Sequence, residues 1–164
     1  MASVATWDEV VRAAPELADA VTASMNMHKH KVLATLRADG SPRVTGTELE
    51  FVLGEAWLGS MTGARKVADL RRDGRVAIHN APDDAELAGG DAKLSGIAIE
   101  VDDPATKQAF LDARGHDRGD VPEAFHLYRI DVTEIVHTSM GDPADHLVIR
   151  SWRTGRGETR IERH

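Results

Sequence analysis

The sequence contains no cysteine. This absence excludes disulfide bonds, thiolate nucleophiles, and metal or iron–sulfur sites that depend on cysteine ligands. The chain also lacks an apolar run long enough to span a bilayer, and its N-terminus lacks the basic and then apolar pattern of a signal peptide. We therefore expect a cytoplasmic protein with no membrane-embedded part.

An excess of positive charge is also missing. The formal net charge is −7 and the isoelectric point is near 5.6, so the chain as a whole repels nucleic acid and anionic membranes. A partner that carries phosphate must then meet a local basic site, which favours a small molecule over a polymer. With 164 residues, 41% hydrophobic and 29% charged, the composition predicts a single soluble domain over residues 1–164.

Two short helices are expected at the N-terminus, within residues 1–30. Thr6 and Glu9 have the spacing of a capping box, in which each side chain binds the other residue's backbone N–H. Pro15 suits the first position of a helix and not its interior, so Ala14 should end the first helix and Pro15 should begin the second.

Alternating segments follow over residues 31–153, and they predict a mainly β fold of the α+β class. Asp39 and Gly40 separate the first two segments with a hairpin signal, and Gly96 indicates a bulge or a close backbone approach in the fifth. Asp103 and Pro104 begin a further helix. The expected strands cover residues 32–37, 42–53, 56–60, 75–79, 93–101, 125–138 and 146–152. Few helices intervene, so we expect an antiparallel sheet closed into a split barrel with peripheral helices and a basic tail at 154–164.

The second of these strands, over residues 42–53, has polar and apolar side chains on both faces. Core burial explains such a strand poorly. The pattern favours a ligand groove or a subunit interface along part of its length.

The stretch 59–73 runs from an apolar strand into a helix whose first turn is basic. Thr62 is placed to act as the N-cap, and the remaining first-turn N–H groups and the helix dipole favour a phosphate. Arg65 adds a planar guanidinium group suited to phosphate oxygens, and Lys66 adds a positive charge on a flexible side chain. The alternative interpretation is an ordinary surface helix with its cations in solvent.

Three parts of the sequence together resemble the pyridoxamine 5′-phosphate oxidase-like superfamily: residues 32–44, Ser60 and residues 65–76. The resemblance extends over about residues 28 to 153. It implies a flavin- or deazaflavin-binding split β-barrel, with FMN as the cofactor and the 8-hydroxy-5-deazaflavin coenzyme F420 as the alternative; haem is a weaker candidate. It also implies a homodimer with two cofactor sites at the subunit interface, to which residues 152–156 would extend.

Carried over residue by residue, the resemblance implies a cofactor-binding set. Arg43 would lie near the phosphate, the backbone of Val44 and Thr45 near the ring, and the helix start would hold the phosphate. The complete set is Arg43, Val44, Thr45, Ser60, Thr62, Arg65 and Lys66. Many relatives have serine immediately before the Arg-Lys pair, where this chain has Ala64, so one hydroxyl contact is missing. The C-terminal residues around Arg160 and His164 do not match the substrate motif of vitamin B6 oxidases.

Other catalytic constellations are weak. His28 and His30 lie at a helix-to-strand junction without the spacing of a metal motif, so we expect no metal site. His137 and Ser139 lack a third triad member, which argues against nucleophilic hydrolysis. Redox chemistry of a flavin needs no side-chain base, so no catalytic residue is assigned.

The leading hypothesis is therefore an oxidoreductase that transfers a hydride between a flavin or deazaflavin and a small organic molecule. A non-catalytic flavin or haem carrier or sensor of the same fold is the first alternative. A stress-associated dimer with a degenerate pocket is the second.

Overall fold

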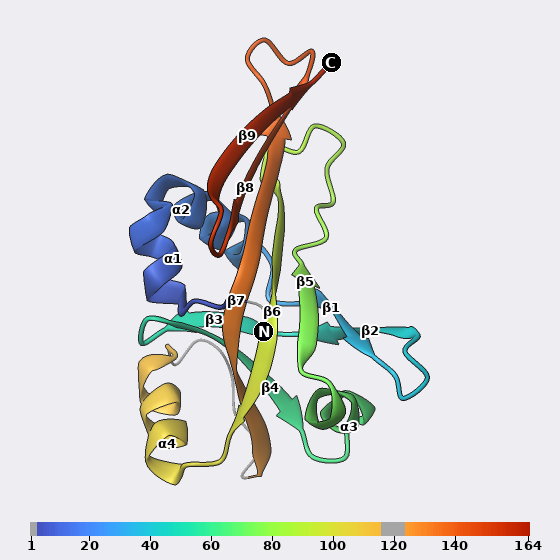
Figure 1. Cartoon of the computed structure of the whole chain (residues 1–164), viewed down its shortest axis with the longest axis vertical. Coiled ribbons are helices and arrows are strands. Elements are labelled where there is room, and N and C mark those ends of the chain that lie inside the picture. The colour runs from blue at the N-terminus through green and yellow to red at the C-terminus, as the bar shows by residue number, and fades with distance from the viewer. Residues whose placement is uncertain (1–2, 116–123) are drawn as a thin grey trace.

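The computed structural model describes residues 3–115 and 124–164. Helices surround a large antiparallel sheet (Figure 1). The helices are α1 (Trp7–Ala13), α2 (Pro15–Asn26), α3 (Arg65–Arg72) and α4 (Pro104–Ala113). The strands are β1 (Lys31–Leu36), β2 (Pro42–Thr47), β3 (Leu49–Val52), β4 (Glu55–Met61), β5 (Arg75–His79), β6 (Asp91–Val101), β7 (Phe125–Met140), β8 (Leu147–Arg153) and β9 (Gly157–Arg163).

The strands pair in the order β2-β1-β5-β6-β7-β4-β3, and β8 pairs with β7 and with β9. The first and last strands of this path, β2 and β3, are consecutive in the chain and are separated only by Glu48. The strand predicted over residues 42–53 is thus two strands. The chain pairs with β1 up to Thr47, and from Leu49 it pairs with β4 instead. The mainly β split-barrel architecture is confirmed. The expectation of a closed sheet was wrong, since the chain and not a hydrogen-bond ladder connects the two edges.

The core lies between the sheet and the two N-terminal helices (Figure 1). Leu17, Val21 and Met25 recur at helical spacing on α2 and are fully buried. They belong to one apolar cluster with Leu58 and Ile130 from the centre of the sheet. Burial of these side chains stabilises the sheet, which contains β2 and β4 and determines where α3 lies.

Local signals at the N-terminus predicted the helix boundaries correctly. The Thr6 backbone N–H donates to Glu9 Oε2 at 2.8 Å, and the Glu9 N–H donates to Thr6 Oγ1 at 3.2 Å. This reciprocal pair is the expected capping box. Ala14 is the C-cap of α1 and Pro15 is the first residue of α2, as expected from the fixed φ and missing N–H of proline.

Gly96 marks a bulge, as expected. The pairing of β6 with β7 shifts its register between Ser95 and Gly96. A Cβ atom at Gly96 would lie 2.5 Å from the backbone oxygen of Asp131, which is closer than a side chain can approach. A bulge of this kind bends its strand locally, and here it lies where β6 pairs with the long strand β7.

The upper half of β7 carries β8 and β9 as an arm that projects beyond the core, with the C-terminus at its end (Figure 1). Residues 157–163 of the expected tail form β9, which pairs with β8 along its whole length. Within residues 3–115 and 124–164, no helix is long and apolar enough to cross a membrane.

Candidate anion-binding site

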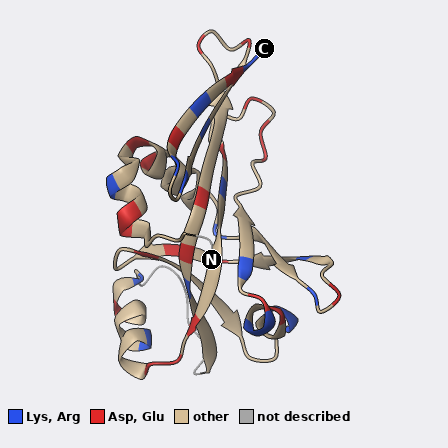
Figure 2. Ribbon diagram, in the orientation of Figure 1, with Lys and Arg blue, Asp and Glu red and all other residues tan. Residues whose placement is uncertain are grey.

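A pocket of about 420 Å³ lies between the β1–β2 hairpin and α3. Figure 2 shows that α3 and the tip of this hairpin are both rich in charged residues, with Lys and Arg prominent on α3. Four arginines and two aspartates dominate the lining, which consists of Arg37, Ala38, Asp39, Arg43, Arg65, Ala68, Asp69 and Arg72. The excess of cations favours an anionic ligand in a protein whose net charge is negative.

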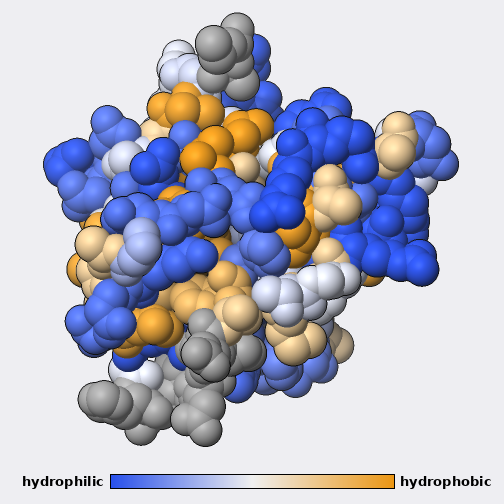
Figure 3. Space-filling view, turned by 90° about the horizontal axis from the view of Figure 1, so that it is seen from below, coloured by the Kyte–Doolittle hydropathy of each residue, from blue (hydrophilic) through white to orange (hydrophobic). Residues whose placement is uncertain are grey.

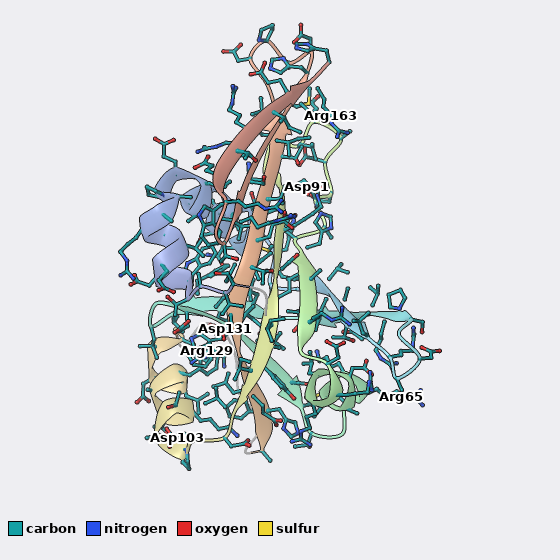
Figure 4. The ribbon with its side chains drawn as sticks, in the orientation of Figure 1. Arg65, Asp91, Asp103, Arg129, Asp131 and Arg163 are labelled. Atoms are coloured by element: carbon teal, nitrogen blue, oxygen red, sulfur yellow. The ribbon has the colours of Figure 1, made fainter. Side chains whose placement is uncertain are left out.

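The helical period explains which residues of α3 reach the pocket. Arg65, Asp69 and Arg72 lie at positions i, i+4 and i+7 and therefore share one side of the helix. Val67 and Leu70 occupy the other side and are buried. Figure 4 shows Arg65 on the side of α3 that faces the β1–β2 hairpin.

Asp69 is a buried carboxylate that holds neighbouring side chains of the pocket in place. Its side chain is only 4% exposed and accepts from Arg43 Nε at 2.6 Å. Thr35 Oγ1 donates to the same carboxylate at 3.0 Å, and Arg72 donates at 3.3 Å. These donors, with Arg43 first, lower the pKa of Asp69 although burial opposes the shift. The carboxylate is therefore charged at neutral pH and holds the Arg43 side chain through one nitrogen.

Arg65 and Lys66 are different, because neither has a carboxylate partner among the described residues. The Lys66 ammonium donates to the backbone oxygen of Gly46 at 3.1 Å. Burial lowers the pKa of Lys66, as expected for a cation that is removed from water without a counter-ion. Two cations at the start of α3 are thus available to an external anion.

The first turn of α3 is not capped as the sequence suggested. Ala64 occupies the N-cap position with an extended backbone and forms no side-chain cap hydrogen bond. Thr62 was expected to be the N-cap, and this expectation was wrong. Gly63 has a φ of +78° and turns the chain between Thr62 and the helix, so the threonine lies outside the capping position. The first N–H groups of α3 consequently have no side-chain acceptor.

The other predicted residues do not line this pocket. Val44 is 67% exposed, whereas the hydroxyl oxygen of Thr45 is buried and has no hydrogen-bond partner within residues 3–115 and 124–164. Ser60 is buried on β4 and stands opposite His126 of β7. The structure therefore brings Arg43 and Arg65 together and places Lys66 against β2.

Sequence reasoning missed Arg37, Asp69 and Arg72. Asp69 and Arg72 could have been found from the helical period that starts at Arg65, since both follow on the same side of α3. The position of Arg37 depends on the hairpin, which brings the end of β1 against α3 and cannot be read from residue spacing.

The charged groups of the pocket favour the binding of an anion over proton transfer. Its two carboxyl groups, Asp39 and Asp69, both have lowered pKa values, held down by Ser41 and Arg43 respectively as the largest causes. Neither is therefore a proton donor near neutral pH. The guanidinium groups of the arginines, next to the fixed carboxylate of Asp69, are suited to donate hydrogen bonds to phosphate oxygens.

The family model for pyridoxamine 5′-phosphate oxidase matches residues 17–139. No curated protein matches the chain in sequence.

Three solved structures illustrate the likeness in fold. PhzG from Burkholderia lata, in complex with tetrahydrophenazine-1-carboxylic acid, has a TM-score of 0.64 and 13% identity, over 94% of this chain and 91% of its own. ChuZ from Campylobacter jejuni has a TM-score of 0.67 and 12% identity, over 90% and 63%. A pyridoxamine 5′-phosphate oxidase-related, FMN binding protein from Nostoc punctiforme has a TM-score of 0.58 and 13% identity, over 92% and 96%. At these identities the likeness concerns the fold.

Proposed function

The chain belongs to the pyridoxamine 5′-phosphate oxidase family, and on that premise we propose that it is a flavin-dependent oxidoreductase that binds FMN with the phosphate in the arginine pocket. The observation that supports this proposal most strongly is the pair of cations at the start of α3. Arg65 and Lys66 have no carboxylate partner among the described residues. Arg65 lines the pocket together with Arg43, which a buried aspartate holds in place, and Lys66 reaches β2 at the backbone oxygen of Gly46.

The residues fit the phosphate group on three counts. Arg43 uses Nε to bind Asp69, so its terminal nitrogens remain for phosphate oxygens. The uncapped first turn of α3 offers backbone N–H groups. Lys66 is partly buried, and an anion would compensate the lost hydration of its ammonium group. A phosphate group supplies acceptors for all three kinds of donor.

When it is bound, FMN supplies the hydride-transfer chemistry. The protein then contributes binding and orientation. Val44 and Thr45 follow Arg43 on β2, and the backbone of these residues would hold the rest of a cofactor whose phosphate is bound at Arg43. That arrangement requires no side-chain base, and the substrate is a small organic molecule whose identity the pocket does not specify.

We further propose a homodimer. Val44 is 67% exposed and Met61 is 69% exposed, both high values for large apolar side chains. Figure 3, which views the molecule from the end where α3 and α4 lie, shows apolar residues between polar ones on the surface. A second subunit against β2 would cover Val44 and shield the cofactor from water. Light scattering coupled to gel filtration measures the mass and tests this assembly.

Coenzyme F420 is the alternative cofactor, because Ala64 lacks the hydroxyl of a typical FMN-phosphate site and still leaves the basic pair in place. Haem is the weaker candidate. The absorption spectrum of the purified protein after addition of each compound in turn distinguishes them. If none of the three binds at micromolar concentrations, the proposed function is wrong.

Turnover separates an enzyme from a carrier or sensor. The reduced cofactor is mixed anaerobically with the protein and with a panel of quinones, enones and tetrapyrroles, and reoxidation is followed by absorbance. We expect reoxidation faster than that of the free cofactor for at least one compound. Binding without any such acceleration would favour the non-catalytic alternative.

A further inference from the structure

A cluster of metal-ligating side chains lies at the end of the projecting arm, far along the chain from the arginine pocket. Asp145 and His146 immediately precede β8, and His164 immediately follows β9. The last pair of the β8–β9 ladder joins Leu147 to Arg163, so the residues beyond it lie side by side. One ligand atom from each of the three side chains lies within 4.8 Å of the other two.

His146 is the fixed member of this cluster. Its side chain is 10% exposed, and its Nδ1 lies 2.7 Å from Asp145 Oδ1. The imidazole ring occupies the space where a side chain at position 141 would begin, since a Cβ atom on Gly141 would lie 2.1 Å from His146 Nε2. The Gly141 N–H also donates to the His146 backbone oxygen at 2.8 Å. Gly141 therefore seats both the backbone and the ring of His146.

The second imidazole faces the first. The ring centroids of His146 and His164 are 4.9 Å apart and the planes are tilted by 30°. A further carboxylate stands behind them, because Glu162 Oε2 lies 4.0 Å from His146 Nε2. The arm thus presents two imidazoles and two carboxylates from two separate segments of its tip, residues 145–146 and 162–164.

We propose that Asp145, His146 and His164 form a binding site for a divalent transition metal of the zinc type. Imidazole nitrogen and carboxylate oxygen are the ligands that such ions take in the absence of cysteine. The metal would replace the proton shared by Asp145 and His146 Nδ1, and water would complete a four-coordinate site. This site is independent of the proposed cofactor pocket.

The arrangement needs only a small contraction to reach coordination geometry. Ligand atoms around tetrahedral zinc at about 2.0–2.1 Å are separated by about 3.3 Å, compared with the present limit of 4.8 Å. Asp145 is an exposed side chain at a loop and His164 is a residue outside the β9 ladder, so both are placed to move toward His146. Glu162 would then accept from His146 Nε2–H and orient the ring, as carboxylates do behind metal-bound histidines.

The test is isothermal titration calorimetry of the tag-free, full-length protein with ZnCl₂. We expect one Zn²⁺ per chain with micromolar affinity or better. His164→Ala and Asp145→Asn should each weaken binding by roughly tenfold or more, since each removes a ligand. The matched control is His28→Ala, which removes an exposed histidine that lies 3.6 Å from Asp83 but outside the cluster.

Thermal unfolding in the absence of metal verifies that each variant is folded. His164 lies beyond the last residue of β9, so its replacement leaves every strand pair intact. The wild-type affinity should be lower in acidic buffer, because protons compete with the metal for its ligands. Failure of the wild type to bind Zn²⁺, or equal loss of affinity in His28→Ala and His164→Ala, would overturn the proposal.

Discussion

Arg43 of β2 and Asp69 of α3 form a 2.6 Å ion pair in which the arginine side chain is 18% exposed and the aspartate side chain 4%. The pair connects the β1–β2 hairpin to the helix that carries the basic residues. Thr35, which pairs with Arg43 in the sheet, donates to the same carboxylate. The aspartate therefore sets the position of an arginine that lines the pocket and that we propose as a phosphate ligand.

Asp69→Asn should destabilise the protein by about 1–3 kcal/mol, because a buried charged acceptor of three donors is lost. Urea denaturation measures the free energy of unfolding. Asp39→Asn is the matched control: Asp39 lines the same pocket but is exposed, and it accepts from the backbone N–H and the hydroxyl of the nearby Ser41. Equal effects of the two substitutions would contradict the role assigned to Asp69.

The same pair predicts a pH dependence. The pKa of Asp69 in the folded protein lies below its ordinary value of 3.8, so its contribution to stability is present above that pH. The contribution is lost as the pH falls through the lowered pKa. Acidification below about pH 4 should therefore cost the wild type more stability than Asp69→Asn, and parallel pH profiles would contradict the assignment.

Lys66→Met should weaken FMN binding by about 1–3 kcal/mol, because one charge-assisted contact to the phosphate is lost. It should leave the stability of the cofactor-free protein unchanged or higher, since a partly buried cation without a counter-ion is removed. Arg65→Ala should weaken binding similarly. Arg71→Ala is the control, because the Arg71 guanidinium on the same helix is already bound by the Glu100 carboxylate. Unchanged affinity in both test variants would remove the phosphate assignment.

Thr45→Val and Thr35→Val should have opposite effects on the stability of the cofactor-free protein. The Thr45 hydroxyl is buried without a partner in the described part of the chain, so its removal should stabilise the fold by about 0.5–1.5 kcal/mol. The Thr35 hydroxyl donates to Asp69, so its removal should destabilise the fold by about 1–2 kcal/mol. Thermal and urea unfolding check the signs, and a destabilised Thr45→Val would show that this hydroxyl has a partner.

Gly96→Ala should lower the free energy of unfolding by about 1–3 kcal/mol, because the new methyl group meets the Asp131 backbone oxygen and must displace β7. Gly59→Ala provides the comparison. A Cβ atom at Gly59 would meet no atom within 4 Å, and the residue also lies in a strand. Similar stabilities of the two variants would contradict the close approach at the bulge.

Local signals in the sequence specified much of this fold. The capping box at Thr6, the helix start at Pro15 and the bulge at Gly96 each depend on residues that are adjacent or close in the chain. Their physical causes act locally, so the sequence was sufficient. The same holds for the Asp39-Gly40 turn, where Gly40 has a φ of +81°.

Features that depend on tertiary placement were predicted less well. The break at Glu48 arises because β2 and β3 pair with different strands, which strand periodicity cannot reveal. Thr62 had the right residue type for an N-cap, but the turn at Gly63 put Ala64 in that position. Asp69 and Arg37 reach the pocket only because the hairpin folds against α3. The cluster that we propose as a metal site could not be predicted from spacing, because His146 and His164 come together through the β8–β9 ladder.

The most direct test of the arginine pocket compares FMN with riboflavin, which has the same ring without the phosphate. Titration of each compound with the wild-type protein, followed by quenching of flavin fluorescence, gives the two dissociation constants. We expect FMN to bind at least about a hundredfold more tightly, because several charge-assisted hydrogen bonds depend on the phosphate. Equal affinities for FMN and riboflavin, or no binding of either, would contradict the account.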